Sequence, residues 1–273
     1  MEKRLIAATL FAVLALSENA CADILLTYKR TFNINGNTFA REQIAQVDDS
    51  SSSLYFDNNL ISGNRRVTGL HRINDQEILF TTQGGFSIGG SSYNRGDIIR
   101  YNRTTGDSSL VFDSSILSDT RVRSVSQFDN GDIAFSVNRD FSIGGTNYGR
   151  GDVVRYSLTL GTHSLYFDAD DIAEGGRHVE ALQVISDTRL ILAGNRNMTL
   201  GGIEFRRGDL IRYNTETGVA SLYRSRDTLA DETRVNALSV ETVPEPGHFT
   251  ALLLLTGAAI RRRRKKAKQA QQK

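Results

Sequence analysis

The chain has 273 residues and a formal net charge of +2 at pH 7, but the charge is unevenly distributed. Without the N-terminal segment and the basic tail, residues 23–243 hold 23 basic and 28 acidic side chains, a net charge of −5. A nucleic-acid partner requires a basic stripe, and here the basic excess lies in the C-terminal tail. Cys21 is the only cysteine, so no disulfide framework is expected.

The N-terminal 22 residues have the order of a secretory signal peptide. Lys3 and Arg4 precede an apolar run of 12 residues, from Leu5 to Leu16, which is shorter than the roughly 20 residues of a membrane-spanning helix. Ala20 and Ala22 supply the small residues that signal peptidase requires at positions −3 and −1. We therefore expect cleavage after Ala22 and export of the chain.

A lipoprotein signal centred on Cys21 is the alternative for this segment. Glu18 stands where such a signal has an apolar residue, which favours ordinary cleavage.

The body of the chain repeats with a period of about 55 residues, the signature of a repeat architecture. Each full copy has a Gly-Gly motif followed by Arg-Gly-Asp, two apolar residues and Arg-Tyr. The copies start at Phe86, Phe141 and Met198, with a degenerate first copy at Phe32.

Within one copy, four short segments have the alternating or apolar pattern of strands, separated by turn residues. In the second copy these segments are Gly96–Asn102, Ser108–Asp113, Arg121–Phe128 and Asp132–Val137. Four antiparallel strands in about 55 residues are typical of one propeller blade. The sequence thus predicts an all-β, four-bladed β-propeller, with a β-sandwich or β-solenoid of the same repeats as the alternatives.

The body also begins and ends within a repeat, so the last strand can complete the first sheet. The segment Arg234–Val240 matches the innermost-strand pattern that the first copy lacks. Pairing of this C-terminal strand with the N-terminal strands would close a ring and remove exposed sheet edges. Equivalent positions of the four innermost strands hold small residues, as expected for crowding at an axis: Gly69, Ser124, Ala181 and Ala237.

Other motifs point to structure rather than chemistry. The three Arg-Gly-Asp tripeptides recur because the repeat recurs, and the Gly-Gly pairs are interpreted as turns. The four histidines (His71, His163, His178 and His248) lack metal-ligand spacing. The acidic loop 168–174 lacks the spacing of a calcium-binding loop. We predict no catalytic residues, no metal and no cofactor.

The C-terminal 31 residues have three parts in order. These are the motif Val243, Pro244, Glu245, Pro246, an apolar run from Phe249 to Ile260, and a basic block that begins with Arg261, Arg262, Arg263 and Arg264. The apolar run can enter a membrane as a short transmembrane helix with the arginines on the cytoplasmic side. Its length is short of a bilayer core, which favours a transient anchor over a permanent one.

This tripartite segment resembles the PEP-CTERM sorting signal of Gram-negative bacteria. The resemblance implies recognition by an exosortase at the Pro-Glu-Pro site, then release or transfer to the cell surface, often in bacteria that make exopolysaccharide. An ordinary tail anchor is the alternative. The expected organisation is a signal peptide at 1–22, a repeat β domain at 23–242 and a sorting segment at 243–273.

The functional hypothesis is an exported cell-surface or extracellular-matrix protein that acts as a non-catalytic binding or structural module. Its expected partners are exosortase and signal peptidase during processing, and exopolysaccharide or surface proteins afterwards. The alternative is a secreted propeller lyase or hydrolase that acts on polysaccharide. A passive spacer without any ligand is the third hypothesis.

Overall fold

A computed structural model describes residues 23–41, 43–63, 66–117, 120–175, 179–229 and 234–241. Asp23–Glu241 forms one compact unit. All regular structure in the described residues consists of short antiparallel strands and 3₁₀ turns. None of the described residues forms a helix long and apolar enough to span a membrane. The apolar run 249–260 lies outside the described residues, so its membrane role stays a prediction.

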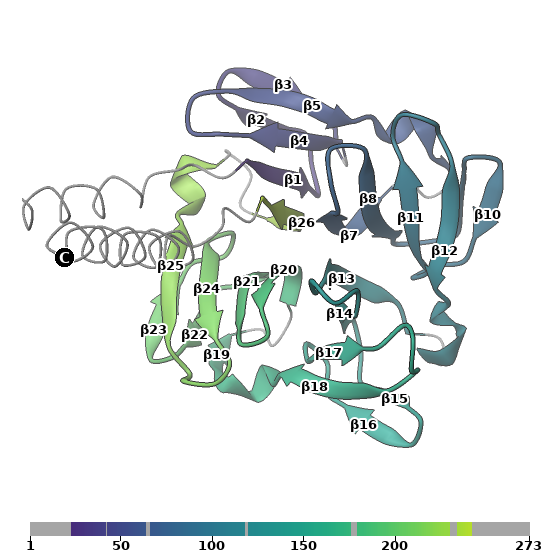
Figure 1. Cartoon of the computed structure of the whole chain (residues 1–273). Helices are drawn as coiled ribbons and strands as arrows, with labels where there is room; N and C mark the ends of the chain where they lie inside the picture. Colours follow the sequence, from purple (N-terminus) through teal and green to yellow (C-terminus); the bar gives the residue numbers. More distant parts are fainter. Residues whose placement is uncertain are drawn as a thin grey trace, which may run out of the picture. The chain divides into compact units, whose positions relative to one another are not determined.

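Four four-stranded antiparallel sheets make up the body (Figure 1). We number them I to IV along the chain, each from its innermost to its outermost strand. Sheet I consists of β26 (Val235–Val240), β1 (Ile24–Tyr28), β4 (Ile44–Val47) and β5 (Ser52–Phe56); sheet II of β7 (Val67–Arg72), β8 (Glu77–Thr82), β11 (Ile98–Asn102) and β12 (Ser108–Phe112); sheet III of β13 (Val122–Gln127), β14 (Ile133–Val137), β17 (Val153–Tyr156) and β18 (His163–Phe167); sheet IV of β20 (Val179–Ser186), β21 (Arg189–Gly194), β24 (Leu210–Asn214) and β25 (Ala220–Arg224).

The predicted pairing of the last strand with the first is confirmed. Strand β26 pairs antiparallel with β1 from Ile24 opposite Val240 to Tyr28 opposite Val235. The backbone N–H of Glu241 also donates to the carbonyl oxygen of Asp23 at 2.9 Å. Sheet I is therefore assembled from both ends of the body.

The innermost strands of the four sheets lie against one another. Strand β7 contacts β26 and β13, and β20 contacts β13 and β26. Figure 1 shows these four strands at the centre of the described body, with the remaining strands of each sheet farther out. The second strands β1 and β14 are buried along their whole length. Shared hydrophobic clusters join sheet I to II, II to III and III to IV.

Each repeat also carries a small hairpin that the sequence reasoning did not predict as strands. The hairpins follow the second strand of each sheet, and a glycine-containing two-residue turn joins their strands. In the first copy Asn35 and Gly36 have φ of 49° and 80°, the left-handed pair that a type I′ turn requires. The hairpins are β2 (Phe32–Ile34) with β3 (Asn37–Phe39), β9 (Phe86–Ile88) with β10 (Ser91–Tyr93), β15 (Phe141–Ile143) with β16 (Thr146–Tyr148), and β22 (Met198–Leu200) with β23 (Ile203–Phe205).

A 3₁₀ turn precedes each innermost strand. These turns are η2 (Asn58–Leu60), η3 (Ser114–Leu117), η4 (Ala169–Asp171) and η5 (Arg226–Thr228). Two short strands, β6 (Ser62–Gly63) and β19 (Ile172–Gly175), follow η2 and η4 and pair with the hairpins at β9 and β22. They link the segment after sheet I to the hairpin of sheet II and the segment after sheet III to the hairpin of sheet IV.

Candidate functional site

The four innermost strands share a β-bulge at the same repeat position. In every case the ladder skips the residue after a buried valine (Val67, Val122, Val179 or Val235). A bulge leaves its extra residue outside the ladder and re-aims its side chain, which is why bulges are common next to functional sites. The valine is invariant among the four copies, whereas the bulged residues all differ: Thr68, Arg123, Glu180 and Asn236.

Glu180 is the carboxylate of this set, with only 1% of its side chain exposed. Its Oε2 accepts from Nη1 of Arg123 at 2.7 Å, and its Oε1 accepts from Nη2 of Arg234 at 2.8 Å. The partners come from β13 and from the residue before β26, so one carboxylate joins sheets III, IV and I. Charge-assisted bonds of this kind offset the large cost of burying an ion.

Three further cations interact with these arginines or with one another. The Arg66 guanidinium donates to Oε1 of Gln83 at 2.5 Å and to Oδ1 of Asn236 at 3.4 Å. The positive charges of Arg234 and Arg66 lower the pKa of Lys29. Burial and the nearby charge of Arg123 lower the pKa of Arg121. We call Lys29, Arg66, Arg121, Arg123, Arg234 and Glu180 the cationic cluster.

The cluster holds donors that the described residues do not use. The Nε atoms of Arg121, Arg123 and Arg234 are buried and have no hydrogen-bond acceptor within the described part of the chain. Since guanidinium groups only donate, these atoms can bond only to an acceptor from outside this set.

A second set of polar residues lies four positions after the same valines, farther along each innermost strand. His71 Nδ1 lies 3.3 Å from Oγ of Ser126 and 3.4 Å from Oε1 of Gln183. The Ser239 hydroxyl donates to the same Gln183 oxygen at 3.1 Å. One side chain from each sheet therefore joins a connected hydrogen-bond network, which we call the polar ring.

The small residues predicted at the crowded part of the inner strands lie between these two sets. A Cβ added at Gly69 would stand 2.8 Å from the backbone nitrogen of Val125 and 3.0 Å from the carbonyl carbon of Ser124. Strands β7 and β13 thus approach too closely for a larger residue at this point. The prediction of close packing at Gly69, Ser124, Ala181 and Ala237 is confirmed, since the latter three are at most 1% exposed.

The Arg-Gly-Asp motifs are structural, as predicted. Asp97 is 2% exposed, and its carboxylate accepts from the backbone N–H of Asn94 at 2.7 Å and of Ser114 at 3.0 Å. Asp152 and Asp209 bond the equivalent backbone groups in their own repeats. The glycines of the three motifs have φ between 85° and 100°, which explains why glycine recurs there.

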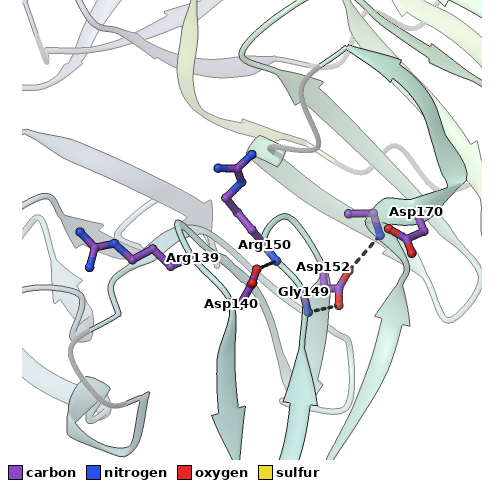
Figure 2. A pocket seen from close by; sticks show the side chains of 7 residues that line it. Arg139, Asp140, Gly149, Arg150, Asp152 and Asp170 are labelled. Carbon is purple, nitrogen blue, oxygen red and sulfur yellow. Dashed lines mark hydrogen bonds between the residues drawn. The ribbon is translucent and has the colours of Figure 1, made fainter.

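The motif at Asp152 lies in a pocket of about 600 Å³, lined also by Arg139, Asp140, Arg150 and Asp170 (Figure 2). Gly149 N–H donates to Asp152 at 2.6 Å, and Arg150 N–H donates to Asp140 at 2.8 Å. Figure 2 shows the Arg139 and Arg150 guanidinium groups extending away from Asp152. Both carboxylates therefore serve the local backbone and do not point together at a ligand.

Two other candidates also have structural roles. The Tyr148 hydroxyl lies 2.7 Å from Nδ1 of His163, where another repeat has Tyr93 donating to Ser108. In the acidic loop, Asp171 accepts from the Tyr213 hydroxyl at 2.7 Å. The described residues contain no group of three or more side chains placed to hold a metal ion.

The sorting and processing residues predicted from the sequence lie outside the described residues and stay predictions. They are Ala20, Ala22, Val243, Pro244, Glu245, Pro246, Arg261, Arg262, Arg263 and Arg264; His178 and His248 also lie outside. The sequence reasoning missed the cationic cluster. Its signal lay on both sides of the inner-strand valines: Arg66, Arg121 and Arg234 precede a valine, and Arg123 and Glu180 follow one.

No family model matches the chain, and no curated protein matches it. The solved structures that are similar to it include the following three. An extracellular domain of a putative hybrid two-component system from B. thetaiotaomicron is 12% identical at a TM-score of 0.33, over 75% of this chain and 28% of that one. A catalytically inactive virginiamycin B lyase from Staphylococcus aureus with quinupristin is 17% identical at a TM-score of 0.32, over 75% and 59%.

The third similar structure, from a nidogen/laminin complex, is 9% identical at a TM-score of 0.37, over 81% of this chain and 98% of that one. The chain thus spans less than two thirds of the first two proteins. At these identities and scores, none of the three assigns a ligand or an activity to this chain.

Proposed function

We propose that this chain is an exported, exosortase-sorted protein whose body is a closed four-bladed β-propeller. Its role is that of a non-catalytic binding module at the cell surface or in the extracellular matrix, associated with exopolysaccharide. The ring is supported by the mutual contacts of β7, β13, β20 and β26 and by the assembly of sheet I from both ends of the body.

The composition of the cationic cluster carries the choice of binding over catalysis. Four of its five cations are arginines, which remain protonated in proteins and act only as hydrogen-bond donors. A set of arginines can hold a negatively charged group but does not exchange protons with it at neutral pH. Glu180, the described carboxylate of the cluster, already accepts from two of these arginines.

The location rests on the ends of the sequence. The N-terminal signal pattern supports export, and the tripartite C-terminal segment supports transfer to the surface by an exosortase. Surface delivery in bacteria that make exopolysaccharide makes a matrix polymer the expected partner. The membrane association is transient in this proposal, because the apolar run from Phe249 to Ile260 is short.

The intact mass of the protein from the cell envelope and from the medium of its native host tests this proposal. A chain that begins at Asp23 and ends near Pro246 is expected, with or without an attached group. A chain that retains Arg261–Lys273 would instead be a tail-anchored membrane protein and would overturn the sorting proposal.

The enzyme alternative is tested with the same purified protein. Incubation with acidic and neutral polysaccharides is expected to leave the length of the polymers unchanged. Depolymerisation that disappears in Glu180→Gln would overturn the non-catalytic assignment and favour a lyase or hydrolase with Glu180 in its active site.

A further inference from the structure

We infer that the cationic cluster is a binding site for a single oxyanion group, and that this group is a carboxylate or sulfate substituent of an acidic polysaccharide. The oxyanion site follows from the described residues alone, whereas its assignment to a polysaccharide rests on the proposed function. No residue of the sorting segment takes part in it.

The charge balance of the cluster is the first argument. The cluster contains five cations and one carboxylate, Glu180, so its described residues carry an excess of four positive charges. Arg123 and Arg234 are 13% and 18% exposed, and charges that are this well shielded from solvent repel one another more strongly than surface charges do. A bound anion would remove much of this repulsion.

The free donors are the second argument. Glu180 takes one Nη of Arg123 and one Nη of Arg234. The Nε atoms of both arginines, and that of Arg121, are buried without an acceptor among the described residues. Guanidinium forks match the planar or tetrahedral oxygens of carboxylate and sulfate groups, so the cluster provides donors of the correct type for an oxyanion.

The extent of the cluster defines the kind of ligand. The cations gather at one end of the innermost strands, while the body as a whole carries a net charge of −5. A long nucleic acid would be repelled by that surface, since its affinity depends on many phosphate contacts. A polymer that presents one acidic substituent to the cluster avoids this cost. We therefore assign the site to a single acidic group.

Lys29 offers a direct experimental readout, because it is the only lysine in residues 23–242. The nearby arginine charges lower its pKa, so a larger fraction of its amine is uncharged and reactive at mildly alkaline pH. An anion in the cluster would raise that pKa and would also cover the amine. Binding should therefore slow the acylation of Lys29.

The experiment measures the rate of Lys29 acylation in the full chain by peptide mass spectrometry at constant ionic strength. The probes are inorganic sulfate, inorganic phosphate, oligogalacturonate and, as the neutral control, maltooligosaccharide. Oligogalacturonate is expected to slow acylation several-fold, and the neutral sugar is expected to have no effect. An equal rate with every probe would overturn the oxyanion site.

Two arginine variants complete the test. Arg121→Gln should weaken oligogalacturonate binding about tenfold or more, as expected for loss of a charge-assisted bond; it breaks no ion pair within the described residues and should fold normally. Arg100→Gln is the matched control, because Arg100 is an exposed arginine outside the cluster that pairs with Glu77 on sheet II. The affinity of this variant for oligogalacturonate should equal that of the parent chain. Equal weakening in both variants would overturn the site.

The inorganic probes separate the two parts of the inference. Protection by sulfate or phosphate without protection by oligogalacturonate would overturn the polysaccharide assignment. The intact-mass measurement decides the sorting separately. If the native protein retains its C-terminal tail but oligogalacturonate still protects Lys29, the proposed sorting is overturned and the oxyanion site stands.

Discussion

At His71, burial and hydrogen bonding act on the same imidazole in opposite directions. Burial lowers its pKa, whereas the contact with Gln183 and the negative charge of Asp129 raise it; the result is a pKa of about 4 in place of 6.5. The ring is therefore neutral at pH 7, and one nitrogen can accept while the other donates. A neutral imidazole suits a network in which hydroxyl and amide groups already supply donors.

This lowered pKa predicts that the body is less stable in mild acid. The unfolded chain takes up a proton at His71 near pH 6.5, whereas the folded chain resists until about pH 4. The contribution of His71 to the free energy of unfolding is fully present above pH 6.5 and is lost as the pH falls from 6.5 toward 4. At pH 5 the free energy of unfolding should be lower than at pH 7 by about 1–2 kcal/mol. Urea unfolding at pH 7 and pH 5 measures the loss, which His71→Gln should reduce. An unchanged loss in that variant would place its origin elsewhere.

Asp97 illustrates why a familiar tripeptide need not be a recognition motif. Its carboxylate accepts from Asn94 N–H, Ser114 N–H and the Ser114 hydroxyl, the last at 2.8 Å. We expect Asp97→Asn to lower the free energy of unfolding by about 2–3 kcal/mol, because an amide NH₂ would face buried donors. Asp107→Asn, at an exposed turn, is the control and should cost well under 1 kcal/mol. Denaturant unfolding of both variants checks this; equal costs would contradict the structural role.

At the scale of the strands, the approach of β7 to β13 limits the residue at Gly69. An added Cβ would meet Cγ2 of Thr81 at 2.9 Å and backbone atoms of Ser124 and Val125, and the backbone atoms cannot rotate away as a side chain can. We predict that Gly69→Ala destabilises the body by about 1–3 kcal/mol through overpacking.

Gly85→Ala is the matched control for this prediction. A Cβ at Gly85 would have its nearest neighbour at 3.5 Å, an ordinary contact, and its backbone has no left-handed φ. Its effect on thermal unfolding should be within about 0.5 kcal/mol. If the two variants unfold at the same temperature, close packing of β7 and β13 does not limit the inner strands.

The repeat pattern predicted the main strands well, because each is an alternating or apolar run bounded by turn residues. The segments predicted in the second copy correspond to β11, β12, β13 and β14. The hairpins were missed because three-residue strands such as Phe86–Ile88 are too short for a periodicity signal. Their Gly-Gly turns were recognised, but turns alone do not define the strands around them.

The candidate site could not be predicted in the same way. Thr68, Arg123, Glu180 and Asn236 lie at bulges where the ladder skips one residue, so strict alternation along the strand does not place their side chains. The ion pairs of Glu180 also join three different sheets, which no local pattern reveals. By contrast, the small residues at Gly69 and its equivalents were predictable, since crowding selects directly for size.

At the scale of the molecule, the two ends of the body belong to one sheet. β26 supplies the innermost strand of sheet I and contacts both β7 and β20. Its residue Asn236 donates to the carbonyl oxygen of Val67, and Ser239 accepts from the backbone N–H of Arg72 at 2.9 Å. The last strand thus links three sheets, although it is the farthest in sequence from its partner β1.

This arrangement predicts that the position of the chain ends within the body is unimportant as long as β26 is present. Glu241 and Asp23 are hydrogen-bonded neighbours, so a short glycine linker should join them without strain. New ends can be placed between Gly144 and Gly145, in the exposed turn of the β15–β16 hairpin, where opening the chain breaks no strand pair. We expect the circular permutant to unfold cooperatively within about 2 kcal/mol of the parent body.

Deletion of β26 should instead abolish cooperative unfolding, because it uncovers the edge of β1 and the inner faces of β7 and β20. Circular dichroism during thermal unfolding distinguishes the two. If the β26 deletion were as stable as the permutant, the ring would not depend on its closing strand, and the four-bladed propeller would have to be abandoned for an open array of sheets.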